Sequence, residues 1–224
     1  MRGIGDTTRG LVLTAVLAAI AGMVDAIGFL RLGHIFVSYM SGNTTQFAIA
    51  LGRGNTGEVA TIGGLIALFV LGAGIGQVVA RASGRWHLSA VLALVAILLA
   101  LATTMAAAPL MVLAMGALNA AMHRSGSFGV SLTYVTGILV KLGQGLGDFV
   151  VWRVRRRDWL AQAAPWIGIV AGGAAAGALY IRIGASALWV ATAAAGLLAF
   201  ASALVSEADC GGVARSAKEG VSSE

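Results

Sequence analysis

Residues 38–43 read Ser-Tyr-Met-Ser-Gly-Asn, and residues 133–138 read Thr-Tyr-Val-Thr-Gly-Ile. Both segments lie inside apolar sequence, and they are 95 positions apart. A polar, glycine-containing backbone at membrane depth is costly unless protein or water satisfies its N–H and C=O groups. A chain that carries such a break twice, at matching places, is typical of an internal repeat with a binding site where the breaks meet.

The composition indicates a multi-pass, all-α membrane protein. Of the 224 residues, 58% are hydrophobic and 11% are charged, and the mean hydropathy is +0.90. A soluble domain has about 25% charged residues. Apolar runs that can cross a bilayer core of about 30 Å lie at residues 11–30, 61–80, 88–107, 109–122, 165–181 and 186–205.

The charge distribution favours lipid partners over nucleic acid. The net charge is +6, but the basic residues lie in loops between apolar runs. They form three clusters, which are Arg2 with Arg9, Arg81 with Arg85, and residues 153–157. Positive loops face the cytoplasm and contact anionic headgroups, so we expect membrane lipids and no nucleic acid as partners.

The residue types that carry metal or catalytic chemistry are sparse. Cys210 is the only cysteine, which excludes a disulfide within the chain. His34, His87 and His123 are far apart and have no metal-ligand spacing. No Ser-His-acid or Cys-His arrangement stands out. We therefore expect no metal, no cofactor and no enzymatic activity.

A shift of 95 positions aligns more than the two breaks. It places residues 13–27 on residues 108–122, and both segments are small, apolar and end in a polar side chain. Asp25 lies at that end in the first segment, and Asn119 nearly matches it in the second. The later apolar runs of the two halves follow in the same order, so the sequence predicts two repeats.

The repeats divide one membrane domain that spans residues 1–206. Repeat one covers about residues 1–107, and repeat two covers about residues 108–206. Residues 207–224 are polar and small, which predicts a disordered tail.

The two interrupted segments, residues 34–52 and 129–150, decide the topology. If both enter the membrane and return, six full spans remain and all three basic clusters lie in the cytoplasm, together with both termini. Each half then has an odd number of crossings, so the repeats are inverted. The alternative is eight crossings, because six extended residues add roughly 20 Å and ten helical residues roughly 15 Å. We favour the model with six spans and two re-entrant segments.

The breaks are the candidate binding site. Ser and Thr commonly cap helix N-termini, so we expect a helix to start at each break, with Ser41 and Thr136 as caps. Such a helix directs free N–H groups and a positive dipole end into the protein, which suits a polar or anionic solute. The alternative is that these residues only cap kinked helices. The expected substrate-binding residues are Tyr39, Ser41, Gly42, Asn43, Tyr134, Thr136 and Gly137.

Three further residues are candidates for coupling or gating. Asp25 stands inside an apolar span, where an ionisable group usually has a function or a partner; the alternative is an interfacial acid paired with Arg31. Asn119 is its approximate counterpart in the second half. Lys141 shares a helix face with Asp148. It can neutralise a bound anion, pair with Asp148, or reach a headgroup.

Residues 22–29 and 36–43, together with residues 116–120 and 133–137, resemble the YoaK-like family of bacterial multi-pass membrane proteins of unknown function. The family commonly has Met-Thr-Gly-Asn where this chain has Met-Ser-Gly-Asn at residues 40–43, so the hydroxyl is kept. The resemblance implies a location in the bacterial inner membrane.

The function that the sequence supports best is a secondary transporter or channel-like permease for a small polar or anionic solute. The solute would bind between the two breaks. The alternative is a non-transporting membrane scaffold or assembly partner, and a homo-oligomer stays open.

Overall fold

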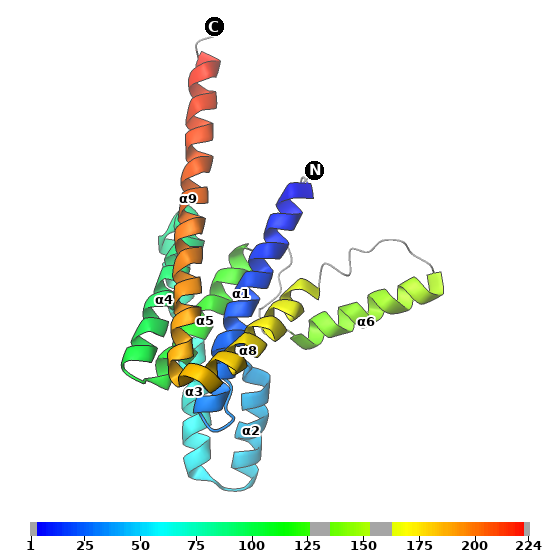
Figure 1. Ribbon diagram of the computed structural model, residues 1–224, viewed down its shortest axis with the longest axis vertical. Helices are drawn as coiled ribbons and strands as arrows, with labels where there is room; N and C mark the ends of the chain where they lie inside the picture. Colours follow the sequence, from blue (N-terminus) through cyan, green and yellow to red (C-terminus); the bar gives the residue numbers. More distant parts are fainter. Residues whose placement is uncertain (1–3, 126–134, 153–162, 222–224) are drawn as a thin grey trace.

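The computed structural model confirms the all-α fold class (Figure 1). The backbone is described for residues 4–125, 135–152 and 163–221, and the side chains for residues 10–120, 135–151 and 163–206. The α-helices are α1 (Ile4–Arg31), α2 (Met40–Gly52), α3 (Thr56–Ala82), α4 (His87–Thr104), α5 (Ala108–Ser125), α6 (Val135–Trp152), α8 (Ala163–Ile183) and α9 (Leu188–Val221). Two short 3-10 helices are η1 (Gly84–Trp86) and η2 (Gly184–Ala187).

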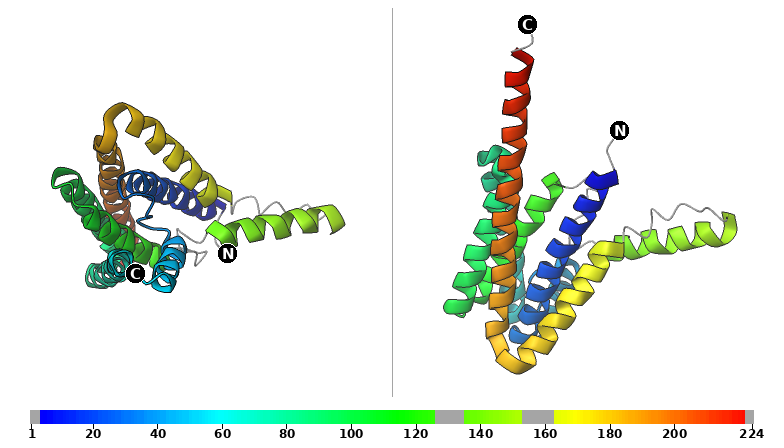
Figure 2. Two further views of the ribbon diagram at one scale, coloured as in Figure 1. Left: turned by 90° about the horizontal axis from the view of Figure 1, so that it is seen from below. Right: turned by 45° about the horizontal axis from the view of Figure 1, so that its top comes forward.

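Among the described residues, 4 helical stretches are long and apolar enough to cross a membrane. They are Gly10–Arg31, Thr56–Ala82, Gly84–Thr104 and Ala163–Ser206, and Ala108–Ala120 is a shorter apolar helix. The last stretch has 44 residues, but it contains α8 and the first part of α9, which form a hairpin at η2 (Figure 2). Gly184 makes this turn with a φ of 58°, and Gly84 makes the turn between α3 and α4 with a φ of 53°. Glycine adopts these left-handed angles without a Cβ clash.

Glycines make the closest contact between α1 and α8. A Cβ atom on Gly22 would meet the carbonyl oxygen of Ile169, and one on Gly172 would meet that of Ala19. Gly168 lies in the same way against Ala15, so residue numbers rise together along the two helices, which are parallel. Small residues allow this close backbone approach between membrane helices.

Helices α3 and α5 also pack closely through glycines. A Cβ atom on Gly72 would meet the carbonyl oxygen of Leu113, and one on Gly116 would meet that of Phe69. Gly76 lies against the backbone of Ala117, so this pair is also parallel.

Helices α4 and α9 form an antiparallel pair. The hydroxyl oxygens of Ser89 and Ser202 lie 2.9 Å apart, and Gly196 faces Ala96 further along the same contact. An interhelical hydroxyl contact of this kind adds a polar bond to an otherwise apolar helix interface.

The directions of the helices are visible in Figure 1. Helices α1, α4 and α8 run downward in that view, whereas α3, α5 and α9 run upward, and both chain ends lie at the upper end. After α1 the chain turns back, and α2 then runs down to the end from which α3 starts. Residues 34–52 therefore enter the bundle and return to the same end.

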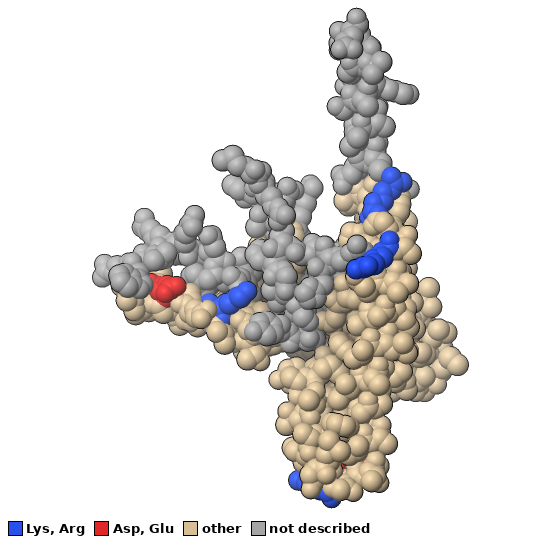
Figure 3. All heavy atoms as spheres, turned by 180° about the vertical axis from the view of Figure 1, so that it is seen from behind, with Lys and Arg blue, Asp and Glu red and all other residues tan. Residues whose placement is uncertain are grey.

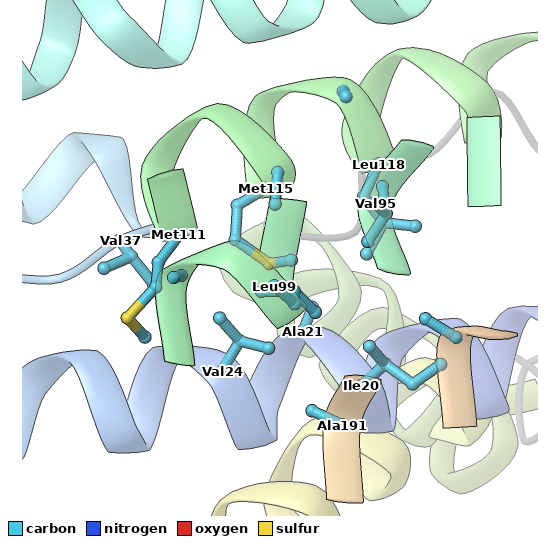
Figure 4. Close-up of a cluster of buried hydrophobic side chains, with 14 of the residues drawn as sticks. Ile20, Ala21, Val24, Val37, Val95, Leu99, Met111, Met115, Leu118 and Ala191 are labelled. Atoms are coloured by element: carbon cyan, nitrogen blue, oxygen red, sulfur yellow. The ribbon is translucent and has the colours of Figure 1, made fainter. Parts of the chain in front are cut away.

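The hydrophobic core anchors this returning segment. Val37, which precedes α2, is fully buried and lies beside Val24 of α1 and Met111 of α5 (Figure 4). Met115 and Leu99 extend the same cluster toward α4. The first break is thus packed into the core and is not a surface loop.

The outer surface suits a lipid environment. In Figure 3 the Lys and Arg side chains of the bundle lie toward its two ends, and the face between them is free of charge. Large apolar side chains on this bundle are exposed, among them Val70 at 64%, Val78 at 67% and Leu197 at 71%. A soluble protein rarely exposes so much apolar surface.

Two segments differ from the arrangement expected from the sequence. Helix α6 extends outward from the bundle and contacts α8 only near its own start (Figures 1 and 2). The preceding residues of the second interrupted segment, 129–134, lie outside the described residues. Helix α9 continues to Val221, whereas we expect a disordered tail from residue 207. Residues 207–219 include several Ala, Glu, Lys and Arg residues, which favour helix.

Candidate functional site

Asp25 of α1 holds the first break through its backbone. One carboxylate oxygen, Oδ1, accepts hydrogen bonds from the backbone N–H groups of Val37 and Ser38 at 2.8 and 2.9 Å. The other, Oδ2, accepts the Ser38 hydroxyl at 2.8 Å. Ser38 is buried, so without Asp25 its N–H group would have no water to bond. The acid that the sequence places inside a span therefore has a specific partner, which is the break itself.

Asn43 of α2 bonds the backbone of Phe36, which comes just before Val37 in the break. Its Oδ1 accepts the backbone N–H of Phe36 at 3.1 Å, and its Nδ2 donates to the Phe36 carbonyl at 2.6 Å. The side-chain amide thus pairs with Phe36 as a neighbouring strand would. Asn43 is fully buried. Asp25 and Asn43 together supply internal hydrogen bonds for residues 36–38, which a non-helical backbone needs at membrane depth.

The expected N-caps are wrong. Helix α2 begins at Met40, and Tyr39 occupies its N-cap position without a side-chain cap. Helix α6 begins at Val135, so Ser41 and Thr136 both lie inside the first turn of their helices. The non-helical part of the first break is therefore residues 32–39, and Asp25 and Asn43 bond its backbone before α2 begins.

A cavity of about 240 Å³ lies beside the break. Asp25 and Ser38 line it, together with the side chains of Phe36 and Tyr39. Its other described lining residues are Ala21, Gly22, Val135 and Ile169. The cavity therefore joins α1, the first break, the start of α6 and the middle of α8.

The cavity includes part of the site predicted from the sequence. Asp25 and Tyr39 line it directly. Gly42 lies under the ring of Tyr39, because a Cβ atom there would clash with the ring edge. Asn43 is buried behind the break, and Ser41 is exposed on α2.

The remaining predicted residues lie at other places. Gly137 is buried and Thr136 is exposed in the first turn of α6, next to Val135 of the cavity, and Tyr134 lies outside the described residues. Asn119 is buried on α5, where its Nδ2 donates to the Met115 carbonyl at 3.0 Å. Lys141 is exposed on α6.

The alternative partner of Asp25, Arg31, bonds elsewhere among the described residues. Its Nη2 donates to the carbonyl of Ala106 at 3.4 Å. The partners described for the Asp25 carboxylate are backbone groups of Val37, Ser38 and Tyr39 and the hydroxyl group of Ser38.

Sequence reasoning missed Ser38, Phe36, Val135 and Ile169. The sequence could have indicated Ser38, since a hydroxyl beside Tyr39 in a polar break is a natural partner for a buried acid. It could not have indicated Ile169, which is one apolar residue in an apolar run.

Comparison with known proteins assigns the chain to a family. A family model described as a protein of unknown function (DUF1275) matches residues 13–201. The UPF0700 transmembrane protein RA0705 of Rhizobium meliloti (strain 1021) is 41% identical over 194 residues, 84% of each chain. The UPF0700 transmembrane protein YoaK of Bacillus subtilis (strain 168) is 32% identical over 164 residues, 66% of this chain and 72% of that protein. No solved structure matches the chain significantly. These matches confirm the resemblance to YoaK-like membrane proteins.

Proposed function

The chain belongs to the DUF1275 family of membrane proteins, and we propose that it is a permease for a small polar solute that binds in the cavity beside Asp25. The main observation behind this proposal is the cavity. It lies where a non-helical segment, a buried acid and the start of α6 meet, and transporter sites form at such discontinuous helices near the membrane midplane.

The proposed permease is built from two inverted repeats. Adding 94 to each α1 position and subtracting 100 from each α8 position converts the contacts of α1 with α8 into contacts of α5 with α3. The glycine contacts related in this way are Gly22–Ile169 with Gly116–Phe69, and Gly172–Ala19 with Gly72–Leu113. The same offset of 94 relates Asp25 to Asn119. Helices α1 and α5 run in opposite directions (Figure 1), which supports inversion.

The starts of the helices support the same relationship. Helices α2 and α6 begin at Met40 and Val135, 95 positions apart, and the turns at Gly84 and Gly184 are 100 positions apart. The repeat boundaries expected near residues 107 and 108 separate α4 from α5.

The topology that follows has six spans and one re-entrant segment, residues 34–52. The second interrupted segment, which the sequence predicts to be re-entrant as well, contains α6, and this helix extends outward from the bundle. The spans are α1, α3, α4, α5, α8 and the first part of α9. Both termini then lie on one side, which agrees with their position at one end of the bundle in Figure 1. Helix α3 ends at that same end, which brings Arg81 and Arg85 to the side of the termini. Loops rich in Arg face the cytoplasm, so we place both termini in the cytoplasm of a bacterial inner membrane.

Asp25 is the coupling or gating acid in this proposal. Its charge and the position of the break are linked, because the carboxylate holds two backbone N–H groups and one hydroxyl. A proton or a cationic group that binds Asp25 competes with these hydrogen bonds and so alters how firmly the break is held. Asn119 is the counterpart of Asp25 in the second half, and its side chain is polar but does not titrate.

The solute is expected to be polar, and the described lining gives little support for an anion. An anion would need Lys141 or another cation close by, but Lys141 is exposed on α6 and is not among the described residues of the cavity.

Uptake into proteoliposomes tests the proposal. The purified protein is reconstituted, incubated with a panel of small polar solutes, and the vesicle lumen is analysed by mass spectrometry. Val135→Trp fills the cavity and is expected to abolish uptake of any solute that the wild-type protein accumulates. Val140→Trp is the matched control, because Val140 is exposed further along α6. Equal uptake by both variants would refute the cavity as the route, and no uptake of any solute by the wild type would favour a scaffold.

A further inference from the structure

We infer that the solute of this cavity is a small organic cation, in which an ammonium group is attached to a short apolar chain. The inference rests on the proposed function and narrows its solute class. It follows from the charge, the hydrogen-bonding capacity, the aromatic rings and the size of the cavity beside the first break.

The charge of the described lining is negative. Asp25 is the one acidic or basic residue among the described residues that line the cavity. A carboxylate inside a membrane protein is costly unless a charge of opposite sign pairs with it. The nearby Arg31 donates to the Ala106 carbonyl instead. A cationic solute would therefore pair with the carboxylate of Asp25.

The carboxylate can exchange a hydroxyl donor for an ammonium donor. Oδ1 accepts the backbone N–H groups of Val37 and Ser38, and the Tyr39 backbone is a further partner of the carboxylate. Oδ2 accepts the Ser38 hydroxyl. An ammonium group has donors and no acceptor, so it can replace this hydroxyl at Oδ2 while Oδ1 still accepts the two N–H groups.

Two aromatic rings flank the same space. The centroids of Phe36 and Tyr39 are 5.3 Å apart in an edge-to-face arrangement, and both residues line the cavity. The faces of aromatic rings attract cations. A ring face turned toward the cavity would therefore favour the same sign of charge as Asp25 does.

The size and the rest of the lining set the form of the cation. A volume of about 240 Å³ lies below the roughly 300–1,000 Å³ that drug-sized ligands occupy. Ala21, Val135 and Ile169 provide apolar lining in the same cavity. A hydrated metal ion would leave this lining without a partner, whereas a short alkyl chain would cover it.

A protection experiment tests the inference. Val135→Cys is made together with Cys210→Ser, which removes the only natural thiol. The reconstituted protein is treated with the small neutral reagent methyl methanethiosulfonate, and its modification rate is followed by mass spectrometry. The probes are butylammonium, butan-1-ol and butyrate, which have similar apolar chains and different head groups. Butylammonium stays protonated at pH 7, as a lysine side chain does.

We expect butylammonium to slow the modification of this cysteine, and butyrate and butan-1-ol to leave it unchanged. Protection by butyrate or butan-1-ol alone, or by no probe, would overturn the cation inference while the solvated cavity of the proposed permease stands. A cysteine that the reagent never reaches in the folded protein would overturn the proposed permease site as well.

Aromatic variants separate cation recognition from folding. Phe36→Leu should weaken protection by butylammonium about threefold to tenfold, because it removes one cation–π contact. Phe47→Leu is the matched control, since Phe47 packs against Gly63 away from the cavity, and it should leave protection unchanged. Equal protection in both variants would contradict the role of Phe36 in cation binding.

Discussion

Replacing Asp25 by alanine should destabilise the protein far more than replacing it by asparagine. Alanine leaves the N–H groups of Val37 and Ser38 without an acceptor, and both residues are buried. Each unsatisfied group costs about 1–3 kcal/mol, so the free energy of unfolding should fall by about 2–6 kcal/mol. Asparagine keeps one acceptor oxygen for both N–H groups, and the Ser38 hydroxyl can turn to accept from its amide.

The loss for Asp25→Asn should therefore stay below about 1.5 kcal/mol, the net value of one hydrogen bond. Thermal unfolding in detergent measures the difference. At about 2–4 °C per kcal/mol for a chain of this size, Asp25→Ala should lower Tm by roughly 4–24 °C. Thr14→Ala on the same helix is the control, because the bond described for its hydroxyl is to the Gly10 carbonyl within α1. If alanine and asparagine were equally harmful, or both harmless, Asp25 would not hold the break as described.

Three further predictions concern packing and topology. Asn43→Leu should lower the free energy of unfolding by about 2–5 kcal/mol, because it removes both bonds to a buried backbone; a Tm equal to wild type would contradict this pairing. Gly72→Ala should disrupt folding, since its Cβ would meet a carbonyl oxygen, whereas Gly74→Ala has open space and should be neutral or stabilising. Equal Tm values for the two glycine variants would contradict the close contact of α3 with α5. In a cysteine-free background, Arg53→Cys and Arg85→Cys should react with impermeant reagents from opposite sides of the membrane, and labelling from one side would refute the six-span topology.

The helices of this protein could be predicted from the sequence because apolar runs and glycine turns are local signals. The six apolar runs correspond to α1, α3, α4, α5, α8 and the first part of α9. The approximate match of Asp25 with Asn119, and a binding site that includes Asp25 and Tyr39, stay predictions from the sequence; the structure shows that Asp25 and Tyr39 line one cavity.

The detail of the break could not be predicted in the same way. Asp25 bonds Val37 and Ser38 from a different helix, just before α2 begins at Met40, and no local propensity reports these bonds. Ile169 lines the cavity only because the contact at Gly22 brings α8 against α1. The composition of an apolar run does not show which other helix it packs against.

Solute uptake driven by a pH gradient tests the central proposal most directly. Proteoliposomes with the wild-type protein and with Asp25→Asn are compared for accumulation of the same small amines, after both proteins are shown to have similar Tm values. The proposal predicts accumulation by the wild type and none by Asp25→Asn, because the variant keeps the break in place but loses the charge. Equal accumulation by the two proteins would contradict it.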